Sequence, residues 1–360
     1  MRPRGIIQKE SVYIFGFPGH TGEKSMNIYD ISQLAGVSIA TVSRVINGSE
    51  RVSEKTRLKV LRIIEENGYT PNAFARGLGL NTMHTVGLLC ADSSDPYLAR
   101  AVYELERELR AGGYDSLLCC TGYELADKEK YLKLLLSKHI DGIIFVGSHF
   151  VEADEEKNEY IRRAAEQVPV LLLGGEMEGA NIYAVRCDEQ AAVRDAALRA
   201  LDSGRENILY LYNSLSYSGR SKLSGFYQAY AARGKSVPEG MVQMLDAYRF
   251  DVVQVRELLL RLWRGGLRFD AVLASEDRLA VGALKFARRQ GLTVPGQLWV
   301  IGCNNSPIAR CCEPELTSID NQLSALTHSG AQTLMGVLEG RSMPKRAVFD
   351  GILIPRDSTT

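Results

Sequence analysis

Polar side chains follow a series of short apolar segments in the second part of this 360-residue chain. They come in pairs: Asp95 and Tyr97, Ser148 and His149, Arg220 and Lys222, Glu276 and Asp277, and Asn304 and Asn305. Carboxylates, amides, hydroxyls and amines bind small polar ligands by hydrogen bonds, and an aromatic ring such as Tyr97 or Phe250 offers an apolar stacking face. The sequence has no G-x-G-x-x-G, P-loop or nucleophile-elbow motif, so the pattern favours a binding site over a catalytic centre.

Some of these residues also have ordinary structural interpretations. Asp95 precedes Pro96 at the expected start of a helix, and Asp188 and Asp277 likewise precede helical segments, so all three are expected to cap helices. His149 is expected to be solvated, because no second histidine lies at metal-ligand spacing.

The apolar segments have the length of strands and alternate with helical segments from residue 85 onward. They cover residues 85–90, 115–120, 142–147, 168–175, 207–213, 271–276 and 299–303. This βαβ alternation predicts an α/β fold with parallel, doubly wound sheets. Ligands bind such sheets outside the carboxyl ends of the strands, which is where the polar pairs are expected to lie.

A different pattern occupies residues 28–68, where two short helical repeats flank Gly36. The first repeat has Ile28, Ile31, Leu34 and Ala35 at helical spacing, and the second has Val42, Val45 and Ile46. Gly36 suits a tight turn and Ser38 suits the N-cap of the second helix. A third helix is expected between Ser53 and Asn67-Gly68, with the apolar set Leu58, Val60, Leu61, Ile63 and Ile64.

This arrangement predicts a helix-turn-helix, a common DNA-binding motif. The second helix would expose Ile39, Ala40, Thr41, Ser43 and Arg44. Small side chains allow close approach to a base edge, and an arginine can bind guanine or a phosphate. The alternative on periodicity alone is a three-helix cap with an ordinary solvated face.

Residues 28–76, IYDISQLAGVSIATVSRVINGSERVSEKTRLKVLRIIEENGYTPNAFAR, resemble the headpiece of the lactose/galactose repressor family. Further motifs similar to that family are HIDGIIFVGS at 139–148, RSKLSGF at 220–226, IGCNN at 301–305 and LIPRDST at 353–359. The resemblance implies an N-terminal three-helix headpiece joined to a two-subdomain core like the periplasmic binding proteins. It also implies a transcriptional regulator, most simply a repressor, that binds palindromic double-stranded operator DNA as a homodimer and responds to a small molecule.

The resemblance sets the expected domain bounds and DNA contacts. Residues 1–26 are expected to be a disordered extension or an upstream mis-start without an assigned function, 27–72 the headpiece, 73–84 a hinge helix or linker, and 85–360 the core. The core would divide into an N-subdomain (about 85–185 and 318–347) and a C-subdomain (about 186–317 and 348–360). The DNA-binding residues would be Tyr29, Ser38, Ile39, Ala40, Thr41, Ser43, Arg44, Asn47, Asn72, Ala75 and Leu78, with Leu78 as a wedge between base pairs.

The same resemblance selects an effector site, with departures from the family pattern. The expected residues are Asp95, Tyr97, Ser148, Arg220, Lys222, Phe250, Glu276 and Asn304. Lys222 stands where relatives have an effector-binding arginine, Asn304 where many have aspartate, and Glu276 where many have asparagine. One cation, one anion and one amide would suit a neutral carbohydrate, while effector identity cannot be taken from relatives.

Composition narrows the remaining functional classes. Lysine and arginine number 43, as do aspartate and glutamate, so no global basic field attracts the chain to DNA and the DNA prediction depends on the motif. The seven cysteines form no CxxC pair, and no metal or cofactor is expected. No apolar run approaches the ~18 residues of a membrane span, and no signal peptide is evident, so a cytoplasmic location is expected. The alternative function is a cytoplasmic sugar-binding or enzymatic α/β protein that does not bind an operator.

Overall fold

The computed structural model of the protein describes residues 26–69, 82–245 and 251–360. The chain separates into two compact units, residues 1–81 and 82–360, and each is described by itself. The expected contacts at Asn72, Ala75, Leu78 and Phe250 lie outside the described residues, as does most of the expected hinge.

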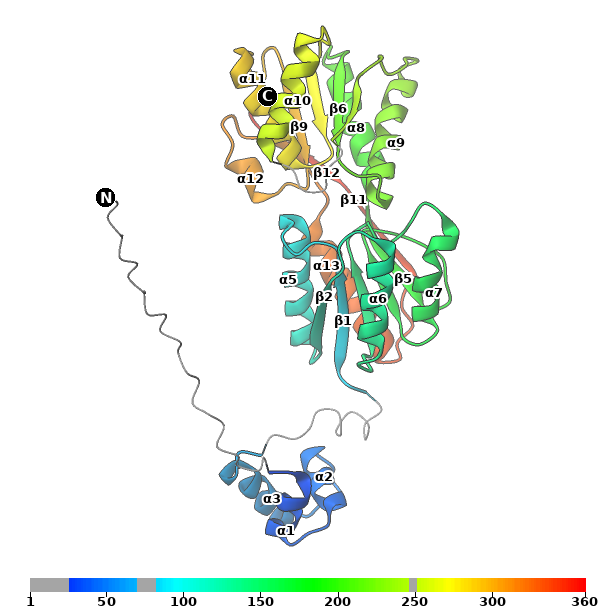
Figure 1. The fold of residues 1–360 in the computed structure, drawn as a ribbon, viewed down its shortest axis with the longest axis vertical. Helices are drawn as coiled ribbons and strands as arrows, with labels where there is room; N and C mark the ends of the chain where they lie inside the picture. The colour runs from blue at the N-terminus through cyan, green and yellow to red at the C-terminus, as the bar shows by residue number, and fades with distance from the viewer. Residues whose placement is uncertain (1–25, 70–81, 246–250) are drawn as a thin grey trace, which may run out of the picture. The chain divides into compact units, whose positions relative to one another are not determined.

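The first unit contains the three expected helices, α1 (Ile28–Ala35), α2 (Ile39–Ile46) and α3 (Glu54–Glu66) (Figure 1). Gly36 ends α1 with a φ of 62°, a left-handed conformation that favours glycine. Ser38 then caps α2, because its Oγ accepts a hydrogen bond from the Thr41 amide at 3.2 Å. The helix-turn-helix prediction is therefore confirmed, including its turn and its cap.

A small apolar core holds these helices together. It consists of Ile31, Ala35, Val42, Val45 and Val60. Several residues of the expected apolar stripes are instead exposed, namely Leu34, Leu58 and Leu61. Each of the three short helices buries only one face against the other two, so leucines at the edge of that face remain exposed to solvent.

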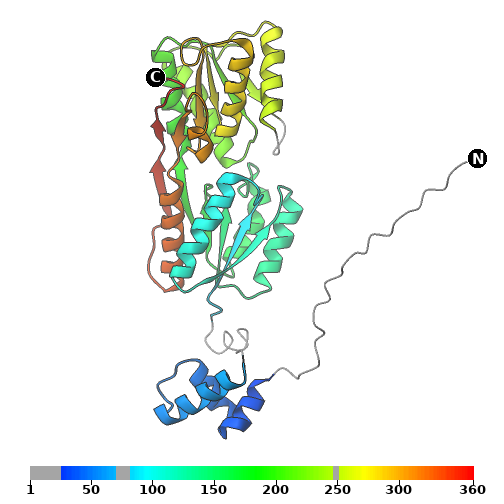
Figure 2. The same ribbon diagram turned by 90° about the vertical axis from the view of Figure 1, so that its left-hand side faces the viewer.

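The second unit contains two six-stranded sheets, seen one above the other in Figures 1 and 2. The first has the order β11-β5-β4-β3-β1-β2 and is parallel throughout. Its strands are β1 (Thr85–Cys90), β2 (Asp115–Cys120), β3 (Gly142–Val146), β4 (Val170–Leu173), β5 (Ile182–Asp188) and β11 (Arg346–Asp350). Its helical segments are α5 (Pro96–Ala111), α6 (Leu125–Leu136), η1 (Glu155–Asn158), α7 (Glu159–Ala165) and α13 (Leu323–Leu338).

The second sheet has the order β12-β10-β9-β8-β6-β7, and only β12 runs antiparallel to its neighbour. Its strands are β6 (Ile208–Tyr212), β7 (Val242–Met244), β8 (Ala271–Ala274), β9 (Trp299–Cys303), β10 (Thr317–Asp320) and β12 (Ile352–Ile354). Its helices are α8 (Glu189–Asp202), α9 (Tyr217–Ala232), α10 (Val252–Arg264), α11 (Asp277–Gln290) and α12 (Pro307–Arg310). We call the parts built on the first and second sheets the N-subdomain and the C-subdomain.

All seven apolar segments identified in the sequence are strands, so the doubly wound prediction is confirmed. Helices cover both faces of each sheet, and the buried residues form separate clusters on the two faces. No helix in the described ranges has the length and apolar character needed to cross a membrane.

The chain passes between the sheets three times, at residues slightly later than expected. β5 stays in the first sheet to Asp188, β10 belongs to the second sheet to Asp320, and β11 stays in the first sheet to Asp350. The strands thus end two or three residues after the approximate bounds expected at 186, 318 and 348. Gly351 alone separates β11 from β12, and a Cβ there would lie 2.5 Å from that of Ala192.

Candidate ligand and DNA-binding sites

The surface of α2 presents the side chains expected to contact DNA. Ile39, Ala40 and Arg44 are exposed, because Val42 and Val45 occupy the inward positions of the same helix. Because the apolar residues of α2 point inward, its opposite face carries the side chains that can contact base edges.

The polar neighbours of this face bind one another. The hydroxyls of Ser38 and Thr41 lie 2.9 Å apart, and Asn47 Nδ2 is 3.5 Å from Ser43 Oγ. Oδ1 of Asn47 has no hydrogen-bond partner in the described part of the chain. Tyr29 is well exposed on α1. The expected DNA contacts within residues 26–69 are therefore exposed or half-buried.

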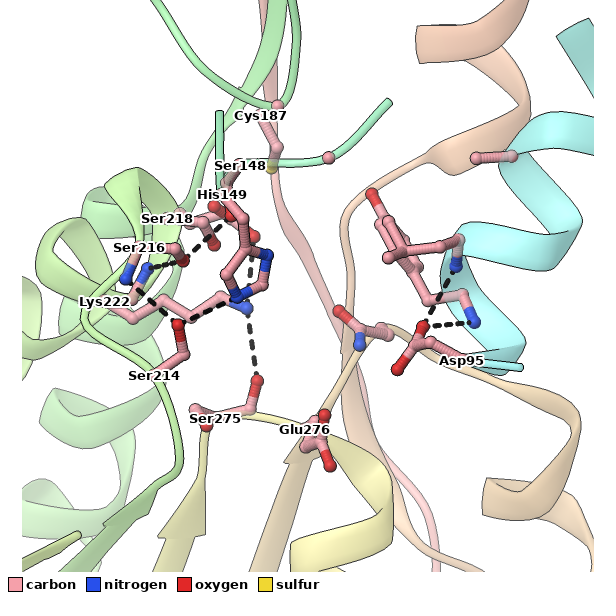
Figure 3. Close-up of a pocket in the computed structure, with 18 of the residues that line it drawn as sticks. Asp95, Ser148, His149, Cys187, Ser214, Ser216, Ser218, Lys222, Ser275 and Glu276 are labelled. Carbon is pink, nitrogen blue, oxygen red and sulfur yellow. Dashed lines mark hydrogen bonds and ion pairs between the residues drawn. The ribbon is translucent and has the colours of Figure 1, made fainter. Parts of the chain in front are cut away.

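A pocket in the second unit lies at the carboxyl ends of the strands of both sheets (Figure 3). Six of the eight expected effector residues line it: Asp95, Tyr97, Ser148, Lys222, Glu276 and Asn304. They follow strands β1, β3, β6, β8 and β9, as the topology of doubly wound sheets requires. Residues of both the N-subdomain and the C-subdomain thus line the pocket.

Lys222 is buried on α9 and already has partners. Its Nζ lies 3.2 Å from Glu189 Oε1 and donates a 3.1 Å hydrogen bond to the carbonyl of Ser275. Burial by itself lowers the pKa of an ammonium, but Cys303 and the Glu189 carboxylate together hold the pKa of Lys222 well above its ordinary value. Lys222 therefore stays charged and is neutralised by Glu189.

Glu276 lies at the start of α11 but does not cap it with its side chain. Its Oε1 is shielded from solvent and has no hydrogen-bond partner within the described residues. Burial, and then the negative charge of Asp95, raise the pKa of Glu276 to about 7. Oε1 of Glu276 is thus a shielded oxygen in the pocket to which no donor among the described residues binds.

Asp95 lies on the side of the pocket opposite Lys222 (Figure 3), and Tyr97 and Asn304 also line the pocket. Oδ1 of Asp95 accepts hydrogen bonds from the amides of Tyr97 at 2.9 Å and Leu98 at 3.0 Å, so its expected role as the N-cap of α5 is confirmed. Asn304 has a φ of 92°, and its Oδ1 accepts a 3.3 Å hydrogen bond from Asn321. These contacts orient the side chains at the end of β1 and β9.

Two loops bind each other across the pocket. Ser148 Oγ lies 2.9 Å from Ser216 Oγ, and His149 Nε2 lies 3.0 Å from Ser214 Oγ. The amide of Tyr217 also donates a 3.2 Å hydrogen bond to the carbonyl of Ser148. We call these contacts the cleft latch, since they join the loop after β3 to the loop after β6.

The expectation that His149 is solvated is wrong. It lines the pocket, and its ring packs edge-on against that of Tyr123 at 4.9 Å. Burial, followed by the charges of Lys128 and Lys222, lowers the pKa of His149 to about 4. The imidazole is therefore neutral at ordinary pH. The sequence signal for a pocket position is that His149 directly follows the apolar strand β3.

Two further expectations need correction. Arg220 does not line the pocket, because it lies two positions from Lys222 on α9 and so projects to a different side; its Nη1 donates to the carbonyl of Leu215 at 2.7 Å. Asp277 is not the N-cap of α11, which begins one residue earlier than expected. Its carboxylate instead accepts hydrogen bonds from Ser306 and Ser318 and so ties α11 to the loop after β9 and to β10. The N-cap role of Asp188 is confirmed.

Several pocket residues had not been identified from the sequence. They are Tyr123, Cys187, Glu189, Asn213, Ser214, Ser216, Ser218 and Ser275, among others. The serines belong to the polar segment directly after β6, the same signal that identified other residues. Glu189 follows β5, a strand whose alternating sequence has no continuous apolar run.

Comparison with known proteins adds independent evidence. Residues 27–72 match the model of bacterial regulatory proteins of the lacI family, and residues 197–359 match that of a periplasmic binding protein-like domain. An HTH-type transcriptional regulator of Lachnoclostridium phytofermentans is 53% identical over 93% of this chain and 99% of its own length. The HTH-type transcriptional regulator DegA of Bacillus subtilis is 30% identical over 92% of this chain and 98% of its own.

Solved structures give the same fold. The lac repressor dimer bound to operator and the anti-inducer ONPF has a TM-score of 0.82 at 21% identity, covering 93% of this chain and 99% of that one. A complex of the transcriptional regulator CelR with cellobiose has a TM-score of 0.65 at 27% identity, covering 92% and 99%.

Proposed function

Because the chain belongs to the lacI family of bacterial regulatory proteins and is a transcriptional regulator, not an enzyme, we propose that it is a repressor controlled by a small carbohydrate. It binds a palindromic operator as a homodimer in the cytoplasm. Membership of this family removes the alternative of an enzymatic or free-standing sugar-binding protein. The observation that carries the proposal is the polar pocket, to which both subdomains contribute side chains.

The DNA-binding part of the proposal depends on α2. The small Ala40 and the apolar Ile39 are exposed and can contact base edges in the major groove. Arg44 can donate two hydrogen bonds to guanine. Thr41 and Ser43 are placed to contact phosphates, which position the helix without reading sequence. Asn72, Ala75 and Leu78 keep the DNA-contacting roles proposed for them from the sequence.

Exposed apolar side chains support the homodimer. β2 is an edge strand of the first sheet, and Leu117 and Leu118 on it are exposed. Tyr103 on α5, the helix that packs beside β2, is 61% exposed. An edge strand and a helix with uncovered apolar residues are a surface on which a second copy of the chain can pack. Two headpieces would then bind the two halves of one palindrome.

The effector part depends on the crossings of the chain. Ligand groups in the pocket would bind Asp95 and Tyr97 of the N-subdomain together with Glu276 and Asn304 at the C-subdomain face. A molecule that contacts both parts favours one relative orientation of them over others. Hydroxyl-rich carbohydrates suit this site, because its serines, amides and carboxyl groups both donate and accept hydrogen bonds. CelR, one of the structural neighbours, was solved with cellobiose.

A gel-shift titration tests the proposal. The full chain is mixed with DNA from beside its own gene and with a scrambled duplex of equal length, and a panel of mono- and disaccharides is then added. We expect tighter binding to the first duplex, a complex of two chains on one duplex, and a change in affinity with at least one saccharide. Equal affinity for both duplexes, or no response to any saccharide, would contradict the proposal.

A further inference from the structure

The charged side chains that line the pocket do not balance. Among its described lining residues, the carboxylates are Asp95, Glu189 and Glu276, and Lys222 is the cation. His149 adds no positive charge, since burial holds its pKa at about 4. The combination of Lys222, Glu276 and Asn304 expected from the sequence is neutral, but Glu189 also lines the pocket and adds a negative charge.

Lys222 is not available to a ligand. Its ammonium is buried between Glu189 Oε1 at 3.2 Å and the Ser275 carbonyl at 3.1 Å. Groups of the protein itself thus already neutralise and hydrogen-bond Lys222. An anionic ligand would have to compete with Glu189 for this cation. Breaking a buried ion pair leaves an uncompensated charge, which is strongly unfavourable.

Glu276 is in the opposite situation. Its Oε1 is shielded from solvent without a hydrogen-bond partner in the described part of the chain, and Figure 3 shows its carboxyl group in the pocket with no protein contact drawn to it. A buried polar atom without a partner costs free energy, and more so when it is charged. The pocket is therefore complete only when a ligand supplies a donor.

Asp95 contributes a second carboxylate to the same space. Its hydrogen bonds to the Tyr97 and Leu98 amides both use Oδ1, and its charge acts on Glu276. The two groups come from different subdomains, since Asp95 begins α5 beside the first sheet and Glu276 precedes α11 beside the second. Like charges on the two subdomains face each other across the pocket.

We propose that the effector is a saccharide that carries a protonated amine, and that this ammonium group binds to Glu276 with Asp95 on its other side. The inference rests on the proposed carbohydrate function and replaces the neutral sugar expected from the sequence. A hydroxyl donates one hydrogen bond and leaves the negative charge of Asp95, and that of Glu276 in its ionised form, uncompensated. An ammonium has three donors and a positive charge. It can therefore donate a hydrogen bond to Oε1 of Glu276 and also reduce the repulsion between Glu276 and Asp95.

This assignment also connects the ligand to the subdomain movement. Without a cation, repulsion between Asp95 and the ionised form of Glu276 favours a wider separation of the subdomains. A bound ammonium reverses the sign of the interaction and holds the subdomains together. A neutral sugar can contact both parts, but it does not remove the repulsion.

Calorimetry with matched sugars tests the inference on the full chain. The probes are glucosamine and glucose, galactosamine and galactose, mannosamine and mannose, with glucuronate as an anionic sugar, all at pH 7. In at least one pair we expect the amine to bind about tenfold or more tightly than the hydroxyl, because charge-assisted hydrogen bonds exceed neutral ones. The preference should disappear in Glu276→Gln, while it should persist in Glu239→Gln, a matched change at an exposed site.

The outcomes separate this inference from the function on which it rests. If neutral sugars bind as tightly as their amine counterparts, or glucuronate binds most tightly, the amine assignment is wrong and the carbohydrate function stands. If no sugar of the panel binds, both are overturned. If the amine preference survives in a folded Glu276→Gln variant, as judged by an unchanged circular dichroism spectrum, Glu276 is not the group that recognises it.

Discussion

Nε2 of His149 lies 3.0 Å from Oγ of Ser214, and this contact joins the N-subdomain to the C-subdomain beside the pocket. The backbone of His149 is held independently, because the buried Lys128 donates to its carbonyl at 2.5 Å and to Glu152 at 2.7 Å. The imidazole is thus presented to the other subdomain from a fixed position. The cleft latch is thus a specific connection between the two subdomains.

Removing one hydroxyl of the latch should loosen both loops. Ser148→Ala deletes the 2.9 Å contact to Ser216 without removing a helix cap. A net loss of about 1 kcal/mol, typical of one hydrogen bond, should speed amide exchange of residues 214–219 about fivefold. Hydrogen exchange with mass spectrometry measures this, with the exposed Ser342→Ala as the control. Unchanged exchange would mean that the contact between Ser148 and Ser216 does not stabilise the loop after β6.

Acid should weaken the fold through His149. Its pKa is lowered by burial, then by Lys128 on α6 and Lys222 on α9, to about 4, so the unfolded chain binds the proton more readily. Stability is therefore lost as the pH falls from about 6.5 towards 4, by up to about 3 kcal/mol. Urea unfolding across this range should show a smaller loss for His149→Gln. His328→Gln, at an exposed ring, should behave like the unchanged protein.

Glu276 should destabilise the ligand-free protein at alkaline pH. Burial and Asp95 raise its pKa to about 7, while Arg278 and Lys222 oppose the shift and Asp277 adds to it. A carboxyl group with a raised pKa contributes stability that is fully present below its unfolded pKa and is lost as the pH rises through 7. Glu276→Gln should therefore be more stable than the unchanged protein above pH 7, by up to about 3 kcal/mol, and similar below about 4.5.

Scanning calorimetry between pH 4.5 and 8.5 measures this difference. Glu239→Gln serves as the control, since that carboxylate is exposed. A melting temperature of Glu276→Gln that stays below that of the unchanged protein at every pH would show that the carboxyl group is satisfied in the free protein.

Arg44 should contribute sequence recognition. Its side chain is exposed on α2 beside Ile39 and Ala40, and a bidentate contact to guanine is worth about 1–3 kcal/mol. Arg44→Ala should weaken operator binding by that amount and change affinity for random DNA much less. Fluorescence anisotropy with both duplexes measures the difference, with Arg62→Ala on α3 as the control. An equal loss on both duplexes would assign Arg44 to a phosphate.

The sequence was most informative where burial is extensive. Strands such as β1 and β3 are continuous apolar runs, because helices cover both of their faces, and they were identified within a residue or two. The strands β7 and β12 have three residues each and lie at sheet edges, so they bury too little to leave a pattern. Strand ends located most of the pocket residues, because topology places those ends together.

Side-chain direction was harder to infer. Arg220 and Lys222 both follow β6, yet only Lys222 lines the pocket, and their separation of two helical positions explains the difference once the helix is placed. The pairing of Lys222 with Glu189 joins residues 33 positions apart, on the two neighbouring helices α8 and α9 of the C-subdomain. No local pattern encodes such a contact, so the charge of the pocket could be read only from the fold.

The single residue between β11 and β12 has a mechanical consequence. Gly351 is the one residue that connects β11 to β12, and a Cβ at this position would lie 2.5 Å from Cβ of Ala192 and 3.3 Å from Sγ of Cys187. Gly351 and the crossings after Asp188 and Asp320 are therefore the positions about which the subdomains can rotate relative to one another. In a rotation, displacement grows with distance from the axis, and Thr85 starts β1 at the end of the first sheet remote from the pocket. A small rotation of the N-subdomain about Gly351 therefore displaces Thr85 farther than it displaces the pocket residues.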